Sequence, residues 1–315
     1  MAFYCNWLSS SALKKVSCDY PLTAWKSADP DDWKNGKVKM VFRKDLGFPN
    51  TEMQLPCGQC AGCRLDRARG WAIRCVHESS LHATNCFLTL TYRDADLPPG
   101  ATLRPKDMQD FLKRLRKNIE PIKIRFFQCG EYGENTKRPH HHCLLFGYDF
   151  PDKLLIRSSG SHPLYNSATL DRLWGHGFCS IGELTFDSAC YVSRYILKKI
   201  TGDAADAHYG DRKPEYVTMS RRPGIGREWY SQFSSDLYNH DRCVVRDGFL
   251  ARPPKYYDKL YELDSPDHFR DLKVNRKNRA IAMASEHTDD RRAIKAELRR
   301  LKQSKIPRSY EEATE

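Results

Sequence analysis

The pattern of hydrophobic and polar positions along the chain predicts a mixture of helices and strands. Hydrophobic residues that recur at helical spacing predict helices over Arg64–His82, Asp107–Glu120, a short segment ending near Trp174, and Ser188–Ile200. Alternating β-branched and aromatic residues predict strands over Val38–Arg43, Cys86–Tyr92, Ile122–Cys129, His140–Phe146 and Phe178–Leu184. A long loop is predicted over Tyr148–Ala168, and the pattern weakens after Tyr230.

The order of these elements predicts the fold class. The strands Ile122–Cys129 and His140–Phe146 are joined by the polar segment Gly130–Arg138, so we expect an antiparallel pair. Strands and helices interspersed around such a pair indicate an α+β fold, in which helices flank an antiparallel sheet. We expect Asp187 or Ser188 to be the N-cap of the helix over 188–200. Three regions are predicted: a cysteine-containing N-terminal region (1–82), a central domain (83–235) and a basic C-terminal extension (236–315).

Charge adds a class of partner to this picture. The 315 residues include 52 Lys and Arg against 40 Asp and Glu, a net charge of +12. Such an excess favours a polyanionic partner, because neutralised phosphates release counterions. We expect no membrane partner, since no run approaches the roughly 18 apolar residues of a span and the start lacks a signal-peptide pattern. Without an export signal, the 12 cysteines are expected to be reduced.

Three consecutive histidines carry the strongest chemical signal. On a strand, His140 and His142 share a face and lie about 6.6 Å apart, whereas His141 points to the other face. The predicted hairpin brings Glu131 back toward His140, and Glu134 competes for the same role. Two imidazoles and one carboxylate can hold a divalent ion and leave positions open for substrate oxygens. The alternative is an ordinary histidine cluster.

Two tyrosines predict a nucleophile. On the helix over 188–200, Tyr191 and Tyr195 are one turn apart, Lys199 continues the row, and Lys198 lies nearby. A phenol titrates near 10, so it attacks a phosphodiester only with help from a metal that polarises the phosphate. The products would be a phosphotyrosine and a free 3′-hydroxyl, and lysine could stabilise the developing charge. Alternatively, the tyrosines pack at the boundary of an amphipathic helix.

Together, these motifs resemble the HUH endonuclease superfamily in its two-tyrosine form, and Phe87–Tyr92 is similar to its first motif. A closer resemblance is to the replication-initiation proteins of microviruses, especially gokushoviruses. It rests on Pro56–Cys63, Gly130–Gly133, Arg138–His140 and Ser220–Gly226. The superfamily pattern has a hydrophobic residue between the two histidines, so the polar His141 leaves a shifted pair as an alternative.

The resemblance implies rolling-circle initiation. The protein would nick single-stranded DNA at a viral origin, stay attached to the 5′ end through a tyrosine, and later reseal the displaced strand. The implied cofactor is Mg²⁺ or Mn²⁺, held by Glu131, His140 and His142. The implied partners are the origin DNA and the host helicase and polymerase. The implied location is the cytoplasm of the infected bacterial host.

A cysteine motif suggests a second metal. Cys57, Cys60 and Cys63 have metal-like spacing, but a structural zinc takes four ligands. The fourth ligand could be Cys5, Cys18, Cys75 or His77. The alternative is a tight turn whose thiols only pack.

Basic and aromatic residues are candidate DNA contacts. Arg221, Arg222 and Arg227 lie in a glycine-containing segment that allows close approach to phosphates. The basic run Arg291–Lys305 could follow a phosphate backbone, and stacking on unpaired bases is predicted for Trp174, Trp229 and Tyr230. Two other functions stay open: a noncatalytic, zinc-stabilised nucleic-acid-binding protein, and a single-tyrosine transposase or relaxase.

Overall fold

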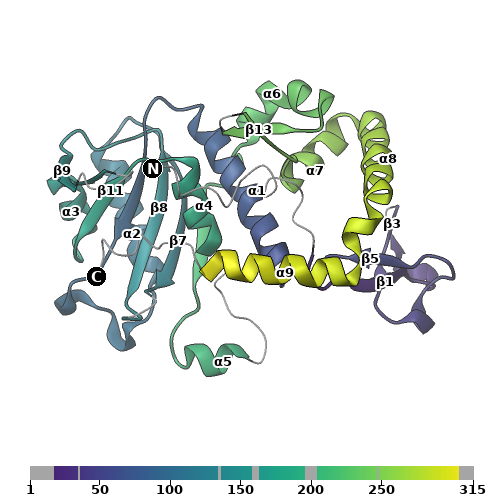
Figure 1. The fold of residues 1–315 in the computed structure, drawn as a ribbon. Helices are drawn as coiled ribbons and strands as arrows, with labels where there is room; N and C mark the ends of the chain where they lie inside the picture. The colour runs from purple at the N-terminus through teal and green to yellow at the C-terminus, as the bar shows by residue number, and fades with distance from the viewer. Residues whose placement is uncertain are drawn as a thin grey trace. The chain divides into compact units, whose positions relative to one another are not determined.

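The computed structural model describes residues 18–34, 36–133, 136–157, 163–195, 204–246 and 248–304 (Figure 1). The chain divides into two compact units. The larger unit contains Ala68–Phe269, and the described part of the smaller unit comprises residues 18–67 and 270–304. The predicted domain boundaries after residues 82 and 235 stay predictions.

A seven-stranded sheet forms the centre of the larger unit, in the order β12-β7-β8-β6-β11-β10-β9. The strands are β6 (Asn85–Leu90), β7 (Arg125–Tyr132), β8 (Pro139–Phe146), β9 (Leu154–Arg157), β10 (Leu164–Asn166), β11 (Cys179–Gly182) and β12 (Tyr216–Met219). All neighbouring strands are antiparallel. Every residue of β8 is buried. The α+β prediction is confirmed.

Helices cover both faces of this sheet. The first four are α1 (Ala61–Ser79), α2 (Pro105–Asn118), α3 (Ala168–Trp174) and α4 (Phe186–Tyr195). The stripe predicted on α2 is buried, and Phe111 packs with Leu88 and Leu145 in one core. On the opposite face, Trp71 of α1 contacts Phe127, at 5.1 Å between ring centroids. Figure 1 shows α4 against β7 and β8 on that same face.

Several boundaries differ from the prediction. Strand β7 continues to Tyr132, because its last residues stay paired with the start of β8. Glu131 therefore lies within a strand rather than in a turn. The predicted loop over 148–168 contains β9 and β10, which pair with each other despite a register shift. The predicted strand Val38–Arg43 is divided between β3 (Lys37–Val38) and β4 (Met40–Val41).

The N-cap predicted for α4 is wrong. The Ser188 N–H donates to Thr185 Oγ1 at 3.2 Å, and the Thr185 N–H donates to Ser188 Oγ at 2.8 Å. This reciprocal pair is a capping box. Because Thr185 directly precedes the helix, it is the N-cap, and Ser188 is the third helical residue. The part of the predicted helix after Tyr195 lies outside the described residues.

Regular structure continues where the sequence pattern weakens. The further elements of the larger unit are α5 (Ala204–Tyr209), α6 (Arg227–Asn239), β13 (Cys243–Arg246), β14 (Phe249–Ala251) and α7 (Lys255–Asp264). Helix α8 (Pro266–Ala282) contributes residues to both units. Short 3₁₀ helices occur at Asp94–Asp96 and Pro99–Ala101.

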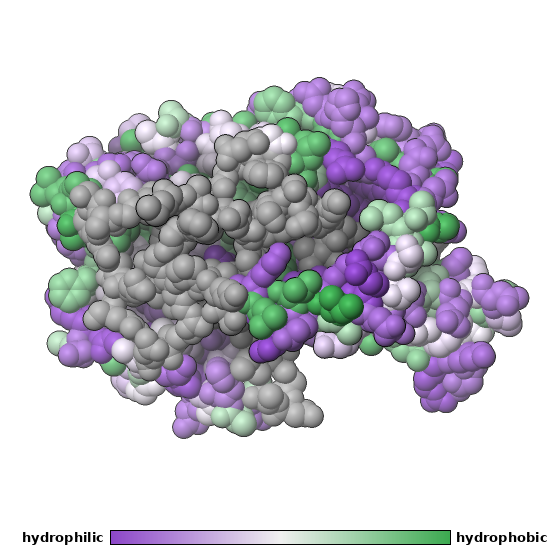
Figure 2. Space-filling view, viewed as in Figure 1, coloured by the Kyte–Doolittle hydropathy of each residue, from purple (hydrophilic) through white to green (hydrophobic). Residues whose placement is uncertain are grey.

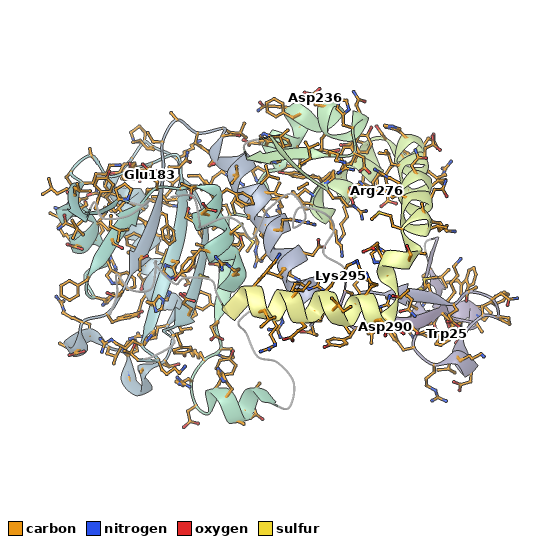
Figure 3. All side chains as sticks on the ribbon, in the orientation of Figure 1. Trp25, Glu183, Asp236, Arg276, Asp290 and Lys295 are labelled. Atoms are coloured by element: carbon orange, nitrogen blue, oxygen red, sulfur yellow. The ribbon has the colours of Figure 1, made fainter. Side chains whose placement is uncertain are left out.

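The smaller unit has a three-stranded antiparallel sheet in the order β4-β1-β5, with β1 at Leu22–Lys26 and β5 at Met53–Leu55. A hairpin joins β2 (Trp33–Lys34) to β3, and 3₁₀ helices occur at Pro30–Asp32, Lys44–Leu46 and Ala284–His287. Trp25 of β1 is labelled in Figure 3.

The basic C-terminal run forms α9 (Asp289–Ser304). Its cations are largely paired with carboxylates: Lys295 Nζ lies 3.0 Å from Glu286 Oε2 (Figure 3), and Arg300 pairs with Glu297 at 2.8 Å. Ile294 and Leu298 are exposed, and Figure 2 shows a hydrophobic stripe along this helix. These ion pairs reduce the charge that α9 offers to a phosphate backbone. Over the described part of the chain, no helix is both long and apolar enough to cross a membrane.

Candidate metal centre

The hairpin of β7 and β8 brings together Glu131, His140 and His142. Glu131 is paired with His140 in the strand register, so the three side chains lie on one face of the sheet. The Nε2 atoms of His140 and His142 each lie 2.7 Å from Glu131 Oε1. All three residues are buried. Their ligand atoms are close enough together to hold one metal ion.

The other nitrogen of each imidazole determines its tautomer. His140 Nδ1 lies 3.3 Å from the carbonyl oxygen of Arg138, which can only accept, so Nδ1 carries the proton. His142 Nδ1 lies 3.0 Å from Thr89 Oγ1, which can accept in the same way. Each Nε2 therefore directs a lone pair toward the carboxylate. Such outer partners are typical of metal-ligating histidines.

The charge of the site also suits a cation. Burial raises the pKa of Glu131, but His140 and His142 outweigh it and hold the pKa at about 2. The carboxylate is therefore ionised near neutral pH. A carboxylate oxygen and two imidazole lone pairs directed at one point are the donor set of a divalent ion. The residues present thus fit Mg²⁺ or Mn²⁺.

The middle histidine lies on the opposite face. His141 Nε2 lies 3.1 Å from Tyr92 Oη, and His141 Nδ1 lies 3.1 Å from Tyr216 Oη. Tyr92 donates to Asp107 Oδ2 at 2.9 Å, so Tyr92 accepts from Nε2–H and Tyr216 donates to Nδ1. Burial lowers the pKa of His141 to about 3, and its ring is neutral. The polar residue in this hydrophobic position is therefore fully hydrogen-bonded, and it does not share a face with Glu131.

A phenol lies beside the histidines. Tyr191 of α4 is buried, and its ring packs edge-to-face on His142, with centroids 5.1 Å apart. It also packs against Phe87 of β6, at 6.2 Å. Tyr195 is the last residue of α4. Its side chain lies outside the described residues, as do Glu134, Lys198 and Lys199.

A second group of ligands forms in the smaller unit. Cys18 joins Cys57, Cys60 and Cys63, and their sulfur atoms lie within 4.8 Å of one another. The Cys18 sulfur lies 3.5 Å from that of Cys57 and 3.7 Å from that of Cys60. All four thiols are free. Four such sulfurs match a structural zinc site.

Backbone N–H groups support these thiols. Cys60 N donates to the Cys57 sulfur at 3.3 Å, and Cys63 N donates to the Cys60 sulfur at 3.4 Å. Burial raises the pKa of Cys57, but the N–H groups of Cys60 and Gln59 outweigh it, and the pKa is about 7. Gly58 has φ +77°, which a side chain would strain, so it permits the turn between the first two cysteines.

The other ligands considered for this cluster lie elsewhere. Cys75 is fully buried within α1. His77 stacks on Trp229, with ring centroids 3.5 Å apart, and its Nδ1 lies 3.1 Å from Tyr257 Oη. Cys5 lies outside the described residues.

The candidate DNA contacts differ in their surroundings. Arg221 and Arg222 are exposed in the loop between β12 and α6. Arg227 is partly buried, donates to Ser231 Oγ at 2.7 Å and lies over the Tyr230 ring. Trp174 and Tyr230 are buried in the core, so neither ring is available to stack on a base. Trp229 is half-buried against His77.

Sequence reasoning missed Thr89 and the carbonyl of Arg138. Thr89 pairs directly with His142 across β6 and β8, so a strand alignment would have shown it. Arg138 is two residues from His140, and its main-chain contact leaves no mark on residue type.

Comparisons with known proteins agree with this arrangement. The family model of the replication-associated protein ORF2 matches residues 85–200, which include Glu131, His140, His142 and Tyr191. Replication-associated protein VP4 of Bdellovibrio phage phiMH2K is 34% identical over 250 residues, which cover 74% of this chain and 76% of that protein.

Two more relatives match over similar lengths. Replication-associated protein ORF2 of Spiroplasma virus 4 is 35% identical over 227 residues, covering 68% of this chain and 70% of that protein. Replication-associated protein ORF4 of Chlamydia phage 1 is 30% identical over 234 residues, covering 71% of this chain and 56% of that protein. No solved structure gives a significant match.

An antiparallel sheet with a buried Glu–His–His group, in a chain with these matches, defines a viral replication-associated protein. More particularly, the chain belongs to the family of replication-associated proteins of microviruses. Membership in this family indicates a role in viral replication.

Proposed function

We propose that the protein initiates rolling-circle replication as a metal-dependent DNA nickase and strand-transferase of the HUH type. Its substrate is single-stranded DNA at a viral origin. One observation carries the proposal: the phenol ring of Tyr191 packs on His142, a candidate metal ligand, at 5.1 Å between ring centroids. A tyrosine nucleophile and a cation site are thus adjacent on the same sheet face.

The residues of the site have separate roles in this scheme. Glu131, His140 and His142 would hold Mg²⁺ or Mn²⁺, and the ion would withdraw charge from the scissile phosphate. Thr89 and the Arg138 carbonyl keep each Nδ1 protonated and each Nε2 available. Without these acceptors, each imidazole could turn or change tautomer.

The phosphoryl transfer exchanges one ester bond for another. The tyrosine Oη forms a bond to phosphorus and loses its proton, while the P–O3′ bond breaks and O3′ takes up a proton. The products are a 5′-phosphotyrosine link and a free 3′-hydroxyl. A later attack by a 3′-hydroxyl on the link reseals the strand. Tyr191 and Tyr195 are the proposed nucleophiles, and Lys199 or Lys198 would assist the charge and proton movement.

The rest of the chain supports this chemistry. The four-cysteine group would hold a structural Zn²⁺. Arg221, Arg222 and Arg227 would contact DNA. The proposed partners are the origin strand and the host helicase and polymerase, in the cytoplasm of the infected bacterium.

The decisive experiment is mass spectrometry of the protein after incubation with an origin oligonucleotide and Mn²⁺. We expect a covalent protein–DNA adduct on a tyrosine. The double variant Tyr191→Phe, Tyr195→Phe should form none, whereas the control Tyr165→Phe, altered in β10 far along the sheet, should form it normally. An adduct that persists in the double variant refutes the nucleophile assignment.

The same assay separates the alternatives. A noncatalytic, zinc-stabilised nucleic-acid-binding protein would bind the oligonucleotide in a salt-sensitive manner but form no adduct with any metal. A single-tyrosine transposase or relaxase would keep multi-turnover transfer after loss of one tyrosine. The two-nucleophile enzyme would stop after the first transfer.

A further inference from the structure

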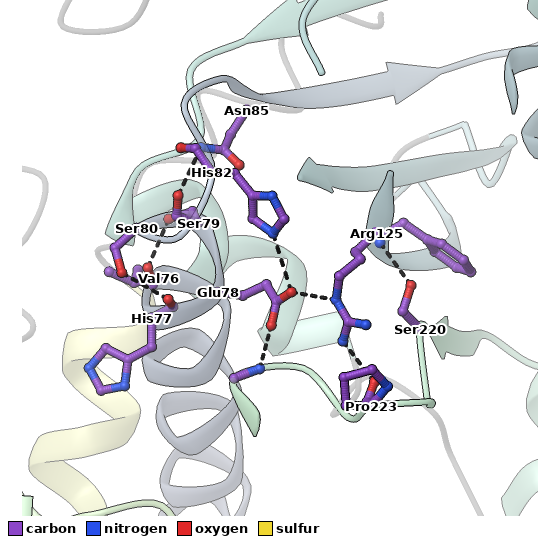
Figure 4. Close-up of polar contacts among 12 residues, drawn as sticks. Val76, His77, Glu78, Ser79, Ser80, His82, Asn85, Arg125, Ser220 and Pro223 are labelled. Atoms are coloured by element: carbon purple, nitrogen blue, oxygen red, sulfur yellow. Dashed lines mark hydrogen bonds and ion pairs between the residues drawn. The ribbon is translucent and has the colours of Figure 1, made fainter. Parts of the chain in front are cut away.

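The loop Ser220–Gly226, between β12 and α6, is fixed by three side chains that are distant in sequence (Figure 4). Glu78 Oε2 accepts from the Gly226 N–H at 2.6 Å. Arg125 Nη2 donates to the Pro223 carbonyl at 2.7 Å. Arg74 Nε donates to the Ile225 carbonyl at 3.0 Å. The backbone of the loop is therefore tied to both α1 and β7.

These three side chains are themselves held firmly. Glu78 is 1% exposed, and it also accepts from Arg125 Nε. The Arg74 guanidinium lies 3.9 Å from the ring centroid of Trp71 and 3.8 Å from that of Tyr256. A buried carboxylate is costly unless its partners stay in place, so this network resists rearrangement.

The glycines of the loop fit closely into this network. A Cβ on Gly224 would lie 2.7 Å from Tyr256 Oη. A Cβ on Gly226 would lie 2.4 Å from Tyr257 Oη, and its φ of +75° already disfavours a side chain. The backbone thus lies directly against α7, with no room to shift inward.

Arg221 and Arg222 contrast with this fixed backbone. Both are exposed, and over the described ranges neither side chain has a hydrogen bond or ion pair. Exposed guanidinium groups suit phosphate oxygens, which they bind with charge-assisted hydrogen bonds. A loop that is already ordered loses little entropy on binding, so each contact contributes more to affinity.

The sheet sets the distance from this loop to the metal centre. Ser220 N donates to the Phe126 carbonyl at 3.0 Å, and Glu131 lies five residues further along β7. At about 3.4 Å per residue, the separation along the strand is about 17 Å. That length corresponds to about five nucleotides at a rise of about 3.4 Å each.

We propose that Ser220–Gly226 is a preorganised phosphate clamp for the single strand that flanks the nicked bond. Arg221 and Arg222 contact the strand, and Glu78, Arg125 and Arg74 are positioning residues that act through the loop. The inference rests on the proposed function, because it takes the metal centre as the point of cleavage.

The test measures binding of single-stranded origin oligonucleotides without divalent ions, so that binding is separated from cleavage. The double variant Arg221→Ala, Arg222→Ala should lower the slope of log K against log salt by about 1.4, or about 0.7 for each lost phosphate contact. Lys117→Ala is the control that removes a charge elsewhere, because Lys117 is exposed on α2, which covers the other face of the sheet. An unchanged slope in the double variant overturns the clamp.

Two further variants test the positioning role. Glu78→Gln and Arg125→Met should each weaken binding several-fold in the otherwise unchanged protein, but have no effect once Arg221 and Arg222 are alanine. Equal losses in both backgrounds would overturn the positioning role. Arg125→Met gives an independent answer if Glu78→Gln does not fold, and the circular dichroism spectrum verifies folding for each.

Oligonucleotide length supplies a measurement that a merely structural role would not change. Shortening the flank from about seven to about three nucleotides should remove the contribution of Arg221 and Arg222, since about five nucleotides span the distance. An equal effect of the arginine variants on both lengths would contradict the clamp. Failure of the clamp leaves tyrosine adducts intact, whereas failure of the proposed function abolishes adducts and leaves binding intact.

Discussion

His77 gives the sharpest prediction about stability. It is 5% exposed, its ring stacks on Trp229, and its Nδ1 lies 3.1 Å from Tyr257 Oη. Burial lowers the pKa of His77 to about 3, against the opposing effect of a hydrogen bond to the Val244 backbone. The unfolded chain titrates near 6.5. Between these two values the unfolded state binds a proton that the folded state does not.

The direction of the pH dependence follows from this difference. Because the folded pKa is depressed, the stabilising effect is complete above about pH 6.5 and is lost as the pH falls toward 3. At pH 5, about 1.5 units below the unfolded pKa, the loss is about 2 kcal/mol at roughly 1.36 kcal/mol per unit. This loss belongs to the wild-type protein and is absent from a variant without the imidazole.

His77→Phe is the informative change, because phenylalanine keeps a ring against Trp229 but cannot titrate. At pH 8 it should destabilise the fold by about 2–4 kcal/mol, since the bonds to Tyr257 and the Val244 backbone are lost. At pH 5 this penalty should shrink by about 2 kcal/mol. Urea denaturation of both proteins at the two pH values measures it, and other titrating groups cancel in the difference. The reasoning fails if the penalty is the same at pH 8 and pH 5.

Two further predictions concern the metal sites. Thr89→Val removes the acceptor for His142 Nδ1, so Mn²⁺ affinity should fall about 10- to 100-fold in calorimetric titration; unchanged affinity would show that Thr89 does not orient the ring. Cys18→Ser should lower the bound zinc by one ion per chain in metal analysis, because only three thiolates remain. The control Cys75→Ala, altered at a cysteine outside the cluster, should retain the zinc, and full zinc content in Cys18→Ser would remove Cys18 from the site.

The sequence by itself determined those features that depend on local periodicity. Alternation along a strand placed His140 and His142 on one face, and the polar segment between two strands indicated the hairpin that brings Glu131 to them. Helical spacing predicted the buried face of α2, with Phe111 in the core. Motif order also gave the resemblance to microvirus replication proteins, and the matched relatives confirm it.

Local patterns misjudged the ends and edges of elements. Glu131 looked like a turn residue, because a charged side chain is unusual in a buried strand, but its pairing with His140 extends β7. The edge strands β9 and β10 lie in a segment without clear alternation and form through pairing with β11. The capping box of α4 required the reciprocal contact between Thr185 and Ser188.

Only the tertiary structure decided which distant residues meet. Cys18 lies 39 residues before Cys57, and Glu78 lies 148 residues before Gly226. The contact of Tyr191 with His142 depends on how α4 packs on the sheet. Spacing along a chain carries information about neighbours within a few residues, because helix and strand geometry repeat locally. Contacts between remote segments depend on packing, which brings together side chains whose sequence separation has no fixed relation to distance.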